Sequence, residues 1–324
     1  MLYEIIATLG PASQDEALWE ELRLAGATAF RLNTSHISLS ELERWLMRLA
    51  RYFDRLGVPL PVVLDLQGSK WRVGQMLPVM LAAGERVELI CAQTSDRRGV
   101  LPVPHSDFFE AGRVSSGEVA LNDGRVLLAV EEISSERAAA RVVQGGEVSA
   151  RKGITYRASD FRAERLSEKD HAIVKNAQGL GFLRYAISYV RDAMEMAKYR
   201  VHFGREVHLT AKIERQSAVD DAESLANHAD ALWLCRGDLG AEVGLRNMAE
   251  QVHLFSRKLR RLQSPVLLAG QVLEHLTVSP AATRSELCHL YDALQAGYCG
   301  FVLSDECAVG KYPVEACRAA ALFR

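Results

Sequence analysis

The chain has 324 residues, of which 48% are hydrophobic and 25% charged, and its formal net charge at pH 7 is −2. This composition excludes a largely disordered chain, and the balanced charge gives no general attraction to nucleic acid or to an anionic membrane surface. No apolar run approaches the roughly 18 residues that a membrane-spanning helix needs. The six cysteines show neither CxxC nor Cys/His metal spacing, so we expect reduced thiols in a cytoplasmic protein.

Short apolar runs alternate with helical patterns through most of the chain. Eight runs are strand candidates: YEIIATLG, TAFRLNTS, PVVLDLQG, GFLRYAIS, VHLTAKIE, ALWLCRGD, PVLLAGQV and GFVLSDE. The helical patterns cover Asp15–Ala25, Leu39–Leu56, Arg191–His202, Ser217–His228, Asn247–Leu262, Thr283–Gln295 and Pro313–Leu322. This alternation predicts an α/β fold, and the number of strands favours a TIM (β/α)8 barrel over a doubly wound sheet.

The alternation is interrupted between residues 73 and 158. Short β-rich pieces such as GERVELICA and RAAARVVQ replace it, and turn residues at Asn122-Asp123-Gly124 and Gly145-Gly146 separate them. We therefore predict a small all-β, barrel-like lid domain at residues 73–158, inserted after the third strand. The catalytic TIM barrel is then predicted to comprise residues 1–72 and 159–324.

Polar side chains gather where the predicted strands end, which is where TIM barrels carry their reactive groups. They are Arg31, Asn33, Asp65, Ser188, Lys212, Glu214, Arg236, Asp238, Ser304 and Glu306. A single charged residue after an apolar run normally just faces water. Mixed charges at the ends of several strands are better explained by a site that binds something charged.

Two of these carboxylates follow neighbouring strands and are candidate metal ligands. Glu214 and Asp238, together with substrate oxygens and water, suit Mg²⁺ or Mn²⁺, which prefer oxygen ligands. Lys212 lies two residues before Glu214 and therefore on the same face of the strand. It could stabilise negative charge on a phosphoryl group or an enolate, or simply form a salt bridge with a carboxylate. Gly237 would let backbone N–H groups approach a ligand carboxylate closely.

Nine segments along the chain carry a resemblance to a known family. They are ATLGPAS, RLNTSH, LDLQGSKWR, LNDG, LSEKD, AKIERQ, CRGDLGAE, TRSE and LSDECAVGKYP. In this order, and with a β-rich insertion between them, they resemble the pyruvate kinase family. The resemblance implies a TIM barrel interrupted by a lid, with an active site between the two. It also implies a small carboxylate or phosphate substrate, with ADP or ATP as a further partner.

The resemblance also implies roles for individual residues. The divalent metal, Mg²⁺ or Mn²⁺, would bind to Glu214 and Asp238. The catalytic residues would be Lys212, which stabilises the phosphoryl group in transfer, with Arg31, Ser304 and Glu306. The substrate would be bound by Arg236, Gly237, Asp238, Gly270 and Ser188. The nucleotide would be bound by Asn33, His36, Arg72, Asp123 and Lys152.

A monovalent-cation region is implied at Asn33, Ser35 and Asp65. Lys70 stands where potassium-independent members of the family have lysine, so its ammonium could serve in place of K⁺. Leu66, which replaces a threonine that helps to bind K⁺, indicates the same. We therefore expect no requirement for K⁺.

The chain departs from the family pattern at several places. It stops at Arg324, so we expect a short, divergent member without the C-terminal domain and its allosteric sugar-phosphate site. Gly270 replaces a threonine associated with the proton step. Val309 and Glu41 replace a lysine and an aromatic residue on the nucleotide side. The segment LCHLYD replaces a run of small residues at a subunit contact, so a homo-oligomer, if formed, could differ.

These observations leave several functions open. The first is magnesium-dependent phosphoryl transfer between phosphoenolpyruvate, or a related acid, and ADP. The second is metal-assisted enolate chemistry on a 2-oxo acid without a nucleotide, as in a decarboxylase or aldolase-type lyase. A kinase that acts on another small hydroxy acid and a non-catalytic metabolite-binding protein are further alternatives.

Overall fold

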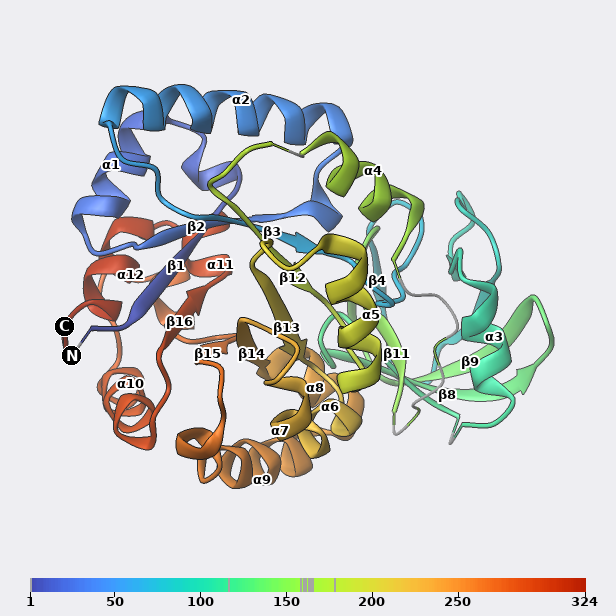
Figure 1. Ribbon diagram of the computed structural model, residues 1–324. Coiled ribbons are helices and arrows are strands. Elements are labelled where there is room, and N and C mark those ends of the chain that lie inside the picture. Colours follow the sequence, from blue (N-terminus) through green and yellow to red (C-terminus); the bar gives the residue numbers. More distant parts are fainter. Residues whose placement is uncertain (1, 116, 158, 160–161, 163–165, 178) are drawn as a thin grey trace.

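The computed structural model describes residues 2–115, 117–157, 159, 162, 166–177 and 179–324. Within this part of the chain, eight parallel strands close into a barrel surrounded by helices, and a separate β structure projects from one side (Figure 1). The predicted TIM-barrel class is confirmed. A doubly wound sheet is excluded because the first strand pairs with both the second and the last.

The barrel strands place their carboxyl ends at one rim. In chain order they are β1 (Glu4–Leu9), β2 (Ala29–Asn33), β3 (Val62–Leu66), β12 (Leu183–Ile187), β13 (Leu209–Ile213), β14 (Ala231–Cys235), β15 (Val266–Ala269) and β16 (Gly300–Leu303). Around the barrel the order is β1-β16-β15-β14-β13-β12-β3-β2. Strands adjacent in the barrel follow one another in sequence, with the lid inserted between β3 and β12.

Alternation along each strand separates two cores. In β14, Trp233 belongs to the cluster inside the barrel, whereas Leu232 and Leu234 pack in the layer between barrel and helices. The interior cluster combines one large ring with small residues, and its members are Ile6, Ala29, Val63, Ala186, Trp233, Cys235, Leu267, Ala269 and Val302. Because side chains fill the barrel, it is a packed core and leaves the rim as the place for chemistry.

The helices surround the barrel. They are α1 (Glu16–Leu24), α2 (Leu39–Leu56), α4 (Glu168–Asn176), α5 (Ala193–Phe203), α6 (Gln216–Asp220), α7 (Ala222–Leu225), α8 (Arg236–Val243), α9 (Leu245–Ser256), α10 (Arg284–Ala296), α11 (Asp305–Ala308) and α12 (Pro313–Ala320). Four 3-10 turns among the described residues are η1 (Pro11–Ser13), η2 (Thr34–His36), η3 (Leu259–Arg261) and η4 (Glu274–Thr277). The predicted helix at Leu39–Leu56 has the observed bounds, whereas the one predicted at Ser217–His228 consists of two short helices, α6 and α7.

Two predicted strand ends are wrong by a few residues. The run ALWLCRGD was predicted as strand throughout, but β14 ends at Cys235 and α8 begins at Arg236. Likewise β16 ends at Leu303, and Glu306 lies in α11. The polar residues are therefore in the first turn of a helix, where backbone N–H groups have no partner within that helix. An apolar run followed by Gly and Asp does not distinguish a strand end from a helix start.

The insertion after β3 has its own core. Its strands are β4 (Val79–Leu81), β5 (Arg86–Ile90), β6 (Val100–Pro102), β7 (Glu118–Leu121), β8 (Val126–Ile133), β9 (Arg137–Gln144), β10 (Gly146–Val148) and β11 (Ile154–Tyr156), and it also contains a helix, α3 (Ser106–Gly112), that the sequence did not predict. The larger sheet has the order β11-β7-β8-β9-β5-β6, and β10 pairs with β4. The insertion point is confirmed. The boundaries 73–158 stay a prediction, and residue 158 lies outside the described residues.

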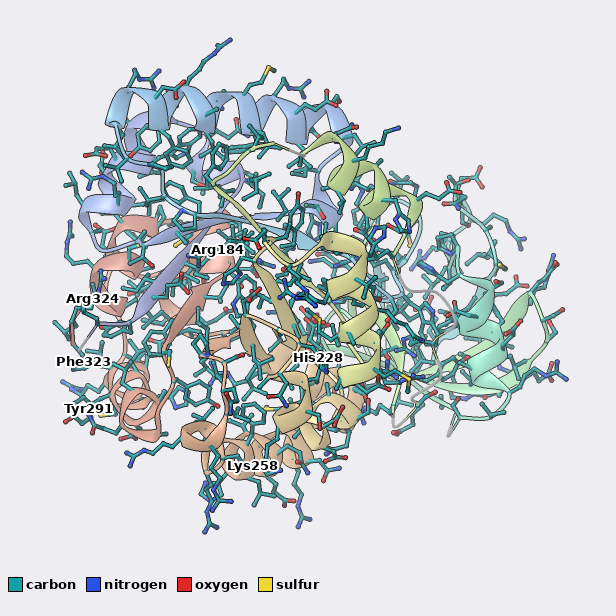
Figure 2. The ribbon with its side chains drawn as sticks, in the orientation of Figure 1. Arg184, His228, Lys258, Tyr291, Phe323 and Arg324 are labelled. Carbon is teal, nitrogen blue, oxygen red and sulfur yellow. The ribbon has the colours of Figure 1, made fainter. Side chains whose placement is uncertain are left out.

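Trp71 anchors the lid at its junction with the barrel. Its ring is fully buried in the core of the lid, packs edge-on against Phe108 and donates a hydrogen bond from Nε1 to Asp107 Oδ1 at 2.7 Å. At the opposite end of the molecule the two termini lie close together (Figure 1), and Phe323 packs on Tyr291 of α10 (Figure 2). Among the described residues, none of the helices combines the length and the apolar sequence needed to cross a membrane.

Closure of the barrel depends on a glycine at the start of β16. Gly300 has φ of +155°, and a Cβ added there would lie 2.2 Å from the Glu4 carbonyl oxygen of β1. Gly300→Ala should therefore lower the free energy of unfolding by about 1–3 kcal/mol, as other overpacking changes do, measured by urea denaturation. Gly181→Ala is the control because a Cβ there would meet nothing within 4 Å. Equal stability of the two variants would contradict this account.

Candidate active site

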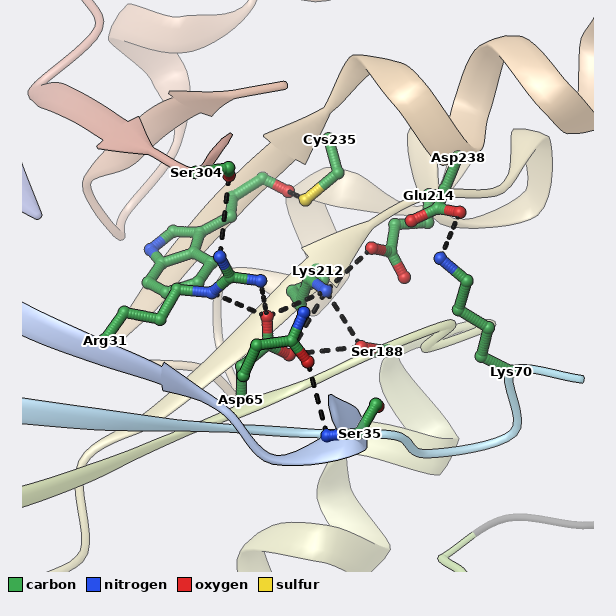
Figure 3. Close-up of polar contacts among 12 residues, drawn as sticks. Arg31, Ser35, Asp65, Lys70, Ser188, Lys212, Glu214, Cys235, Asp238 and Ser304 are labelled. Atoms are coloured by element: carbon green, nitrogen blue, oxygen red, sulfur yellow. Dashed lines mark hydrogen bonds and ion pairs between the residues drawn. The ribbon is translucent and has the colours of Figure 1, made fainter. Parts of the chain in front are cut away.

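Asp65, at the end of β3, is the centre of a buried ion cluster (Figure 3). Its Oδ2 accepts hydrogen bonds from Arg31 Nε at 2.8 Å and Nη2 at 2.6 Å. Its Oδ1 accepts from Lys212 Nζ at 3.1 Å and from Ser188 Oγ at 3.2 Å. Burial acts to raise the pKa of Asp65, but the charges of Lys212 and Arg31 outweigh it, so the pKa lies below its usual value. Asp65 is therefore a fixed negative charge between two cations.

Lys212 joins this cluster to Glu214. Its Nζ lies 2.8 Å from Ser188 Oγ and 2.9 Å from Glu214 Oε1. Burial opposes the charged form of Lys212, but Asp65 and Glu214 more than compensate and raise its pKa. Glu214 is fully buried and its Oε2 accepts a hydrogen bond from the Tyr189 N–H at 2.8 Å. The ammonium is thus permanently charged and held in one position by three side chains.

Asp238, in the first turn of α8, forms an ion pair with Lys70, which follows β3 at the entrance to the lid (Figure 3). Burial acts to raise the pKa of Asp238, but Lys70 and Lys212 hold it below the usual range. Burial and the nearby negative charge of Asp238 instead raise the pKa of Glu214, against the effect of Lys212. The two carboxylates that follow β13 and β14 are therefore electrostatically coupled, as their strand positions predicted.

The side chain of Arg236 turns away from this cluster and holds the loop after β15. Its Nε and Nη2 donate to the Gly270 carbonyl oxygen at 3.0 and 2.7 Å, Nη2 also reaches the Gln271 carbonyl oxygen at 3.0 Å, and Nη1 lies 2.8 Å from His289 Nε2. Because these contacts engage the guanidinium, the predicted role of Arg236 in binding the substrate would fall to its backbone. Arg236 thus supports the site as a structural clamp.

Gly270 lies close against the first residues of α8. Its φ is +86°, and a Cβ added there would lie 3.1 Å from Gly237 N. A threonine at this position would combine an unfavourable backbone angle with a branched side chain. The local backbone therefore suits glycine, and even the first carbon of a side chain at position 270 would be crowded against Gly237 N.

Ser304 and Glu306 lie at the same rim but have different surroundings. Ser304 Oγ is 3.5 Å from Arg31 Nη1. Glu306 is buried and accepts backbone hydrogen bonds from Leu273 N at 3.0 Å and Ser304 N at 2.7 Å. Burial raises the pKa of Glu306. Its contacts tie the loop after β15 to the end of β16, and its catalytic role stays a prediction.

The lid and η2 bring a second group of cations to the rim. Arg151 Nη1 donates to the His36 carbonyl oxygen at 2.8 Å, and Arg72 Nη1 donates to the Arg151 carbonyl oxygen at 2.7 Å. The His36 side chain is exposed, yet the surrounding protein and then the charges of Arg72 and Lys152 lower its pKa. His36 is consequently neutral beside a positively charged surface that could accept phosphates.

Asp123 approaches the site from the turn between β7 and β8. It adopts a left-handed backbone with φ of +57°, and a Cβ added at Gly237 would lie 3.9 Å from its Cβ and Cγ. A neighbouring ion pair between Arg125 and Glu274, at 3.6 Å, also joins lid and barrel. The structure thus brings Asp123 to α8, while His36, Arg72 and Lys152 gather around η2.

The residues of the predicted monovalent-cation region have different contact partners. Asn33 Oδ1 accepts a hydrogen bond from Ser35 N at 3.3 Å, and Asp65 is paired with Arg31 and Lys212. Lys70 contacts Asp238 instead, so it lies against a predicted ligand of the divalent metal. Its role as a replacement for K⁺ stays a prediction.

The two replaced nucleotide-side residues are both at the surface. Val309, after α11, is 59% exposed. Glu41 caps α2 through Ser38, whose N–H and Oγ both lie 2.7 Å from Glu41 Oε2. This capping box stabilises the helix and leaves Glu41 engaged in a local role.

Three supporting residues were missed by the sequence analysis. Lys169 Nζ donates to the carbonyl oxygens of Thr34 and Ile37, each at 2.5 Å. Asp170 accepts from the N–H groups of Gln67 and Gly68 at 3.1 and 3.2 Å. The motif LSEKD contained both side chains, but their backbone partners are more than 100 residues away. Tyr189, the third, acts through a backbone with φ of +57°, which no sequence pattern indicates.

The side chains present fit a divalent cation that completes its coordination with substrate and water. Glu214 and Asp238 are neighbouring buried carboxylates whose present partners are lysines, Lys212 and Lys70. No group of three or more His, Cys, Asp or Glu residues suited to a metal occurs in the described part of the chain. Mg²⁺ typically binds through one or two carboxylates plus substrate oxygens and waters, so two ligands suffice.

The fold and this rim define a class of protein: a TIM-barrel enzyme scaffold with a lid and a cluster of acidic and basic side chains at the carboxyl ends of its strands. The family model for the pyruvate kinase barrel domain matches residues 2–317. The chain belongs to the pyruvate kinase family.

Several pyruvate kinases are similar to this chain. One from Agrobacterium vitis is 33% identical over 316 residues, which cover 97% of this chain and 65% of that protein. One from Aeropyrum pernix is 31% identical, with 96% and 68% covered, and pyruvate kinase 2 from Synechocystis is 31% identical, with 97% and 54% covered. The chain thus spans just under two thirds of the length of the Agrobacterium relative.

Asp65→Asn should destabilise the protein by about 3–5 kcal/mol, because Lys212 and Arg31 would lose the charge that compensates their burial. Since the folded state lowers the pKa of Asp65, its charge stabilises the fold fully above the ordinary pKa of about 4 and progressively less as the pH falls below it. Urea denaturation of both proteins at pH 7 and below pH 4 should show the difference shrinking in acid.

Glu250→Gln is the control for this prediction. Glu250 pairs with Arg246 at 3.1 Å on an exposed helix surface, and such pairs contribute little. If Asp65→Asn were no more destabilising than this control at pH 7, the buried cluster would not contribute the expected free energy of unfolding.

Proposed function

We propose that the protein catalyses Mg²⁺-dependent phosphoryl transfer between an enol phosphate of a 2-oxo acid, of which phosphoenolpyruvate is the simplest, and ADP. The observation that carries this proposal is the position of Lys212. Its charged ammonium lies between Asp65 and Glu214. Lys212 belongs to β13, which pairs with β14, the strand that leads into α8. This arrangement supplies a fixed positive charge next to a place where a small carboxylate can bind.

The proposed role of each group at the site follows from its charge. The backbone N–H groups of Arg236 and Gly237, at the start of α8, would receive the substrate carboxylate. Lys212 and Arg31 would stabilise the negative charge of the phosphoryl oxygens, and because Asp65 and Ser188 already fix Lys212, little reorganisation is needed during the reaction. A divalent ion bound by Glu214 and Asp238 would neutralise charge on substrate oxygens.

The positive surface around η2 supports a nucleotide partner. Arg72, Lys152 and Arg151 lie there together with neutral His36, and charged hydrogen bonds to phosphate oxygens are among the stronger polar contacts. Val309 and Glu41 supply neither a cation nor a ring, so we infer weak binding of ADP. The cytoplasmic location expected from the sequence remains a proposal, and so does assembly into a homo-oligomer.

A second function is favoured by one observation, the glycine at position 270. The threonine that Gly270 replaces is associated with the proton step, so its loss could redirect the enolate to another reaction on a 2-oxo acid. In that case Lys212 would stabilise an enolate formed by decarboxylation or aldol cleavage, and no nucleotide would be used. Nucleotide dependence separates this function from phosphoryl transfer.

We expect the wild-type protein to form ATP from phosphoenolpyruvate, ADP and Mg²⁺ in potassium-free buffer, followed by ³¹P NMR. Lys212→Met should reduce the rate by about 100-fold or more, since it removes a preorganised charge. The addition of KCl at constant ionic strength should leave the wild-type rate unchanged. Strong activation by K⁺ would contradict the predicted independence.

The same experiment distinguishes the alternatives. Phosphoenolpyruvate that stays intact with the wild-type protein would contradict phosphoryl transfer. Incubation with 2-oxo acids and Mg²⁺ without nucleotide, followed by ¹H NMR, would then detect decarboxylation or aldol cleavage. Glu214→Gln should abolish either activity, because both rely on the carboxylate pair.

Val309→Lys should tighten ADP binding by about tenfold, which is the equivalent of one charged hydrogen bond to a phosphate. Isothermal titration with Mg²⁺ and ADP measures this change. Val201→Lys is the matched control, because Val201 is 85% exposed on α5, away from the rim. An equal gain in both variants would indicate a general charge effect rather than a nucleotide contact at Val309.

A further inference from the structure

Lys70 neutralises one of the two carboxylates that are assigned to the metal. It forms an ion pair with Asp238 through Nζ and Oδ1, and the two side chains are only 9% and 13% exposed. Lys212 is paired in the same way with Glu214 at 2.9 Å. Each carboxylate of the proposed metal site therefore already has a lysine as its counter-ion (Figure 3).

The position of Lys70 is built into the fold. Gly68 precedes it in a left-handed turn with φ of +57°, where a Cβ would collide with the Ser188 carbonyl oxygen at 2.1 Å. On the lid side, a Cβ added at Gly153 would lie 2.8 Å from Lys70 Cε. The ammonium also lies 5.8 Å from the centre of the Tyr189 ring. Barrel, lid and α8 thus jointly define the place of this side chain.

The charges within the cluster of ion pairs at the rim balance before any ligand binds. The basic side chains are Arg31, Lys70 and Lys212, and the acidic ones are Asp65, Glu214 and Asp238. A divalent ion that bound alone would have to displace the ammonium from Asp238 and would leave the site with two excess positive charges. An anionic ligand that arrived with the ion would compensate these charges and give the displaced ammonium a new partner.

We propose that Lys70 is an internal counter-ion that competes with the divalent cation for Asp238. Binding of the ion alone is weak for this reason, and binding of the ion and a small anion is mutually reinforcing. Lys70 leaves Asp238 when both are present and pairs with the anion. The inference rests on the proposed function, since it takes Glu214 and Asp238 as the metal ligands.

Titration with Mn²⁺, followed by the electron paramagnetic resonance signal of the free ion, tests this competition without turnover. Lys70→Met should bind Mn²⁺ alone about tenfold more tightly than wild type, or better, because a unit charge beside a divalent ion costs several RT in a partly buried site. Oxalate, a small dianion, should strengthen Mn²⁺ binding to the wild-type protein by a larger factor than to Lys70→Met.

Two further variants separate competition from general charge and from misfolding. Lys152→Met removes a positive charge from the surface around η2 without removing a partner of Asp238, so it should tighten Mn²⁺ binding far less. Lys70→Arg keeps the charge and should keep the weak binding of the wild type, whatever the stability of Lys70→Met. Equal tightening by Lys70→Met and Lys152→Met, or none by Lys70→Met, would overturn the inference.

If the proposed metal ligands were wrong, the Mn²⁺ titrations would give a different result. If Glu214→Gln left Mn²⁺ binding unchanged in the wild type and in Lys70→Met, the two carboxylates would not be the ligands, and the proposed function would lose its metal. If Glu214→Gln abolished binding while Lys70→Met had no effect, the metal site would stand and only the role of Lys70 would be wrong.

Discussion

The buried ion pairs of Lys212 with Asp65 and Glu214 are the interaction on which the rest of the site depends. Charges removed from water are costly unless each has a partner at close range. Here Asp65 comes from β3, whereas Lys212 and Glu214 come from β13 and its end, so the three side chains meet only if β3 and β13 close with the observed register around β12. The barrel and the cluster therefore depend on each other. The strands position the charges, and another register would leave buried charges without partners.

The lid contributes charge and enclosure rather than a second reactive centre. Trp71 ties it to the barrel through Asp107, Asp123 reaches α8, and Arg151 contacts η2. Lys70 lies at the junction itself and pairs with Asp238. The segment from Gly68 to Arg72 belongs both to the end of β3 and to the entrance of the lid. Movement of the lid relative to the barrel would therefore change the contacts of the carboxylate pair.

Several parts of the site were predictable because they follow from strand periodicity. Lys212 and Glu214 are two residues apart, so both face the same way, and their convergence with Asp65 needed only the barrel topology. The contacts of Arg236 could not be predicted, since its guanidinium turns to the Gly270 carbonyl oxygen rather than to the rim. The pairing of Lys70 with Asp238 was missed for a similar reason: 168 residues separate the two side chains, and a flexible lysine has several carboxylates within its reach.

The sequence by itself determined the order of strands and helices, the place of the insertion and the family, because apolar periodicity and short motifs are local properties. The tertiary structure alone decided which charges pair, where strand gives way to helix at Arg236, and why glycine suits position 270. These features depend on distances between segments far apart in the chain and on backbone angles. The physical reason is that Coulomb energy and steric exclusion act through space, whereas a sequence pattern records only neighbours along the chain.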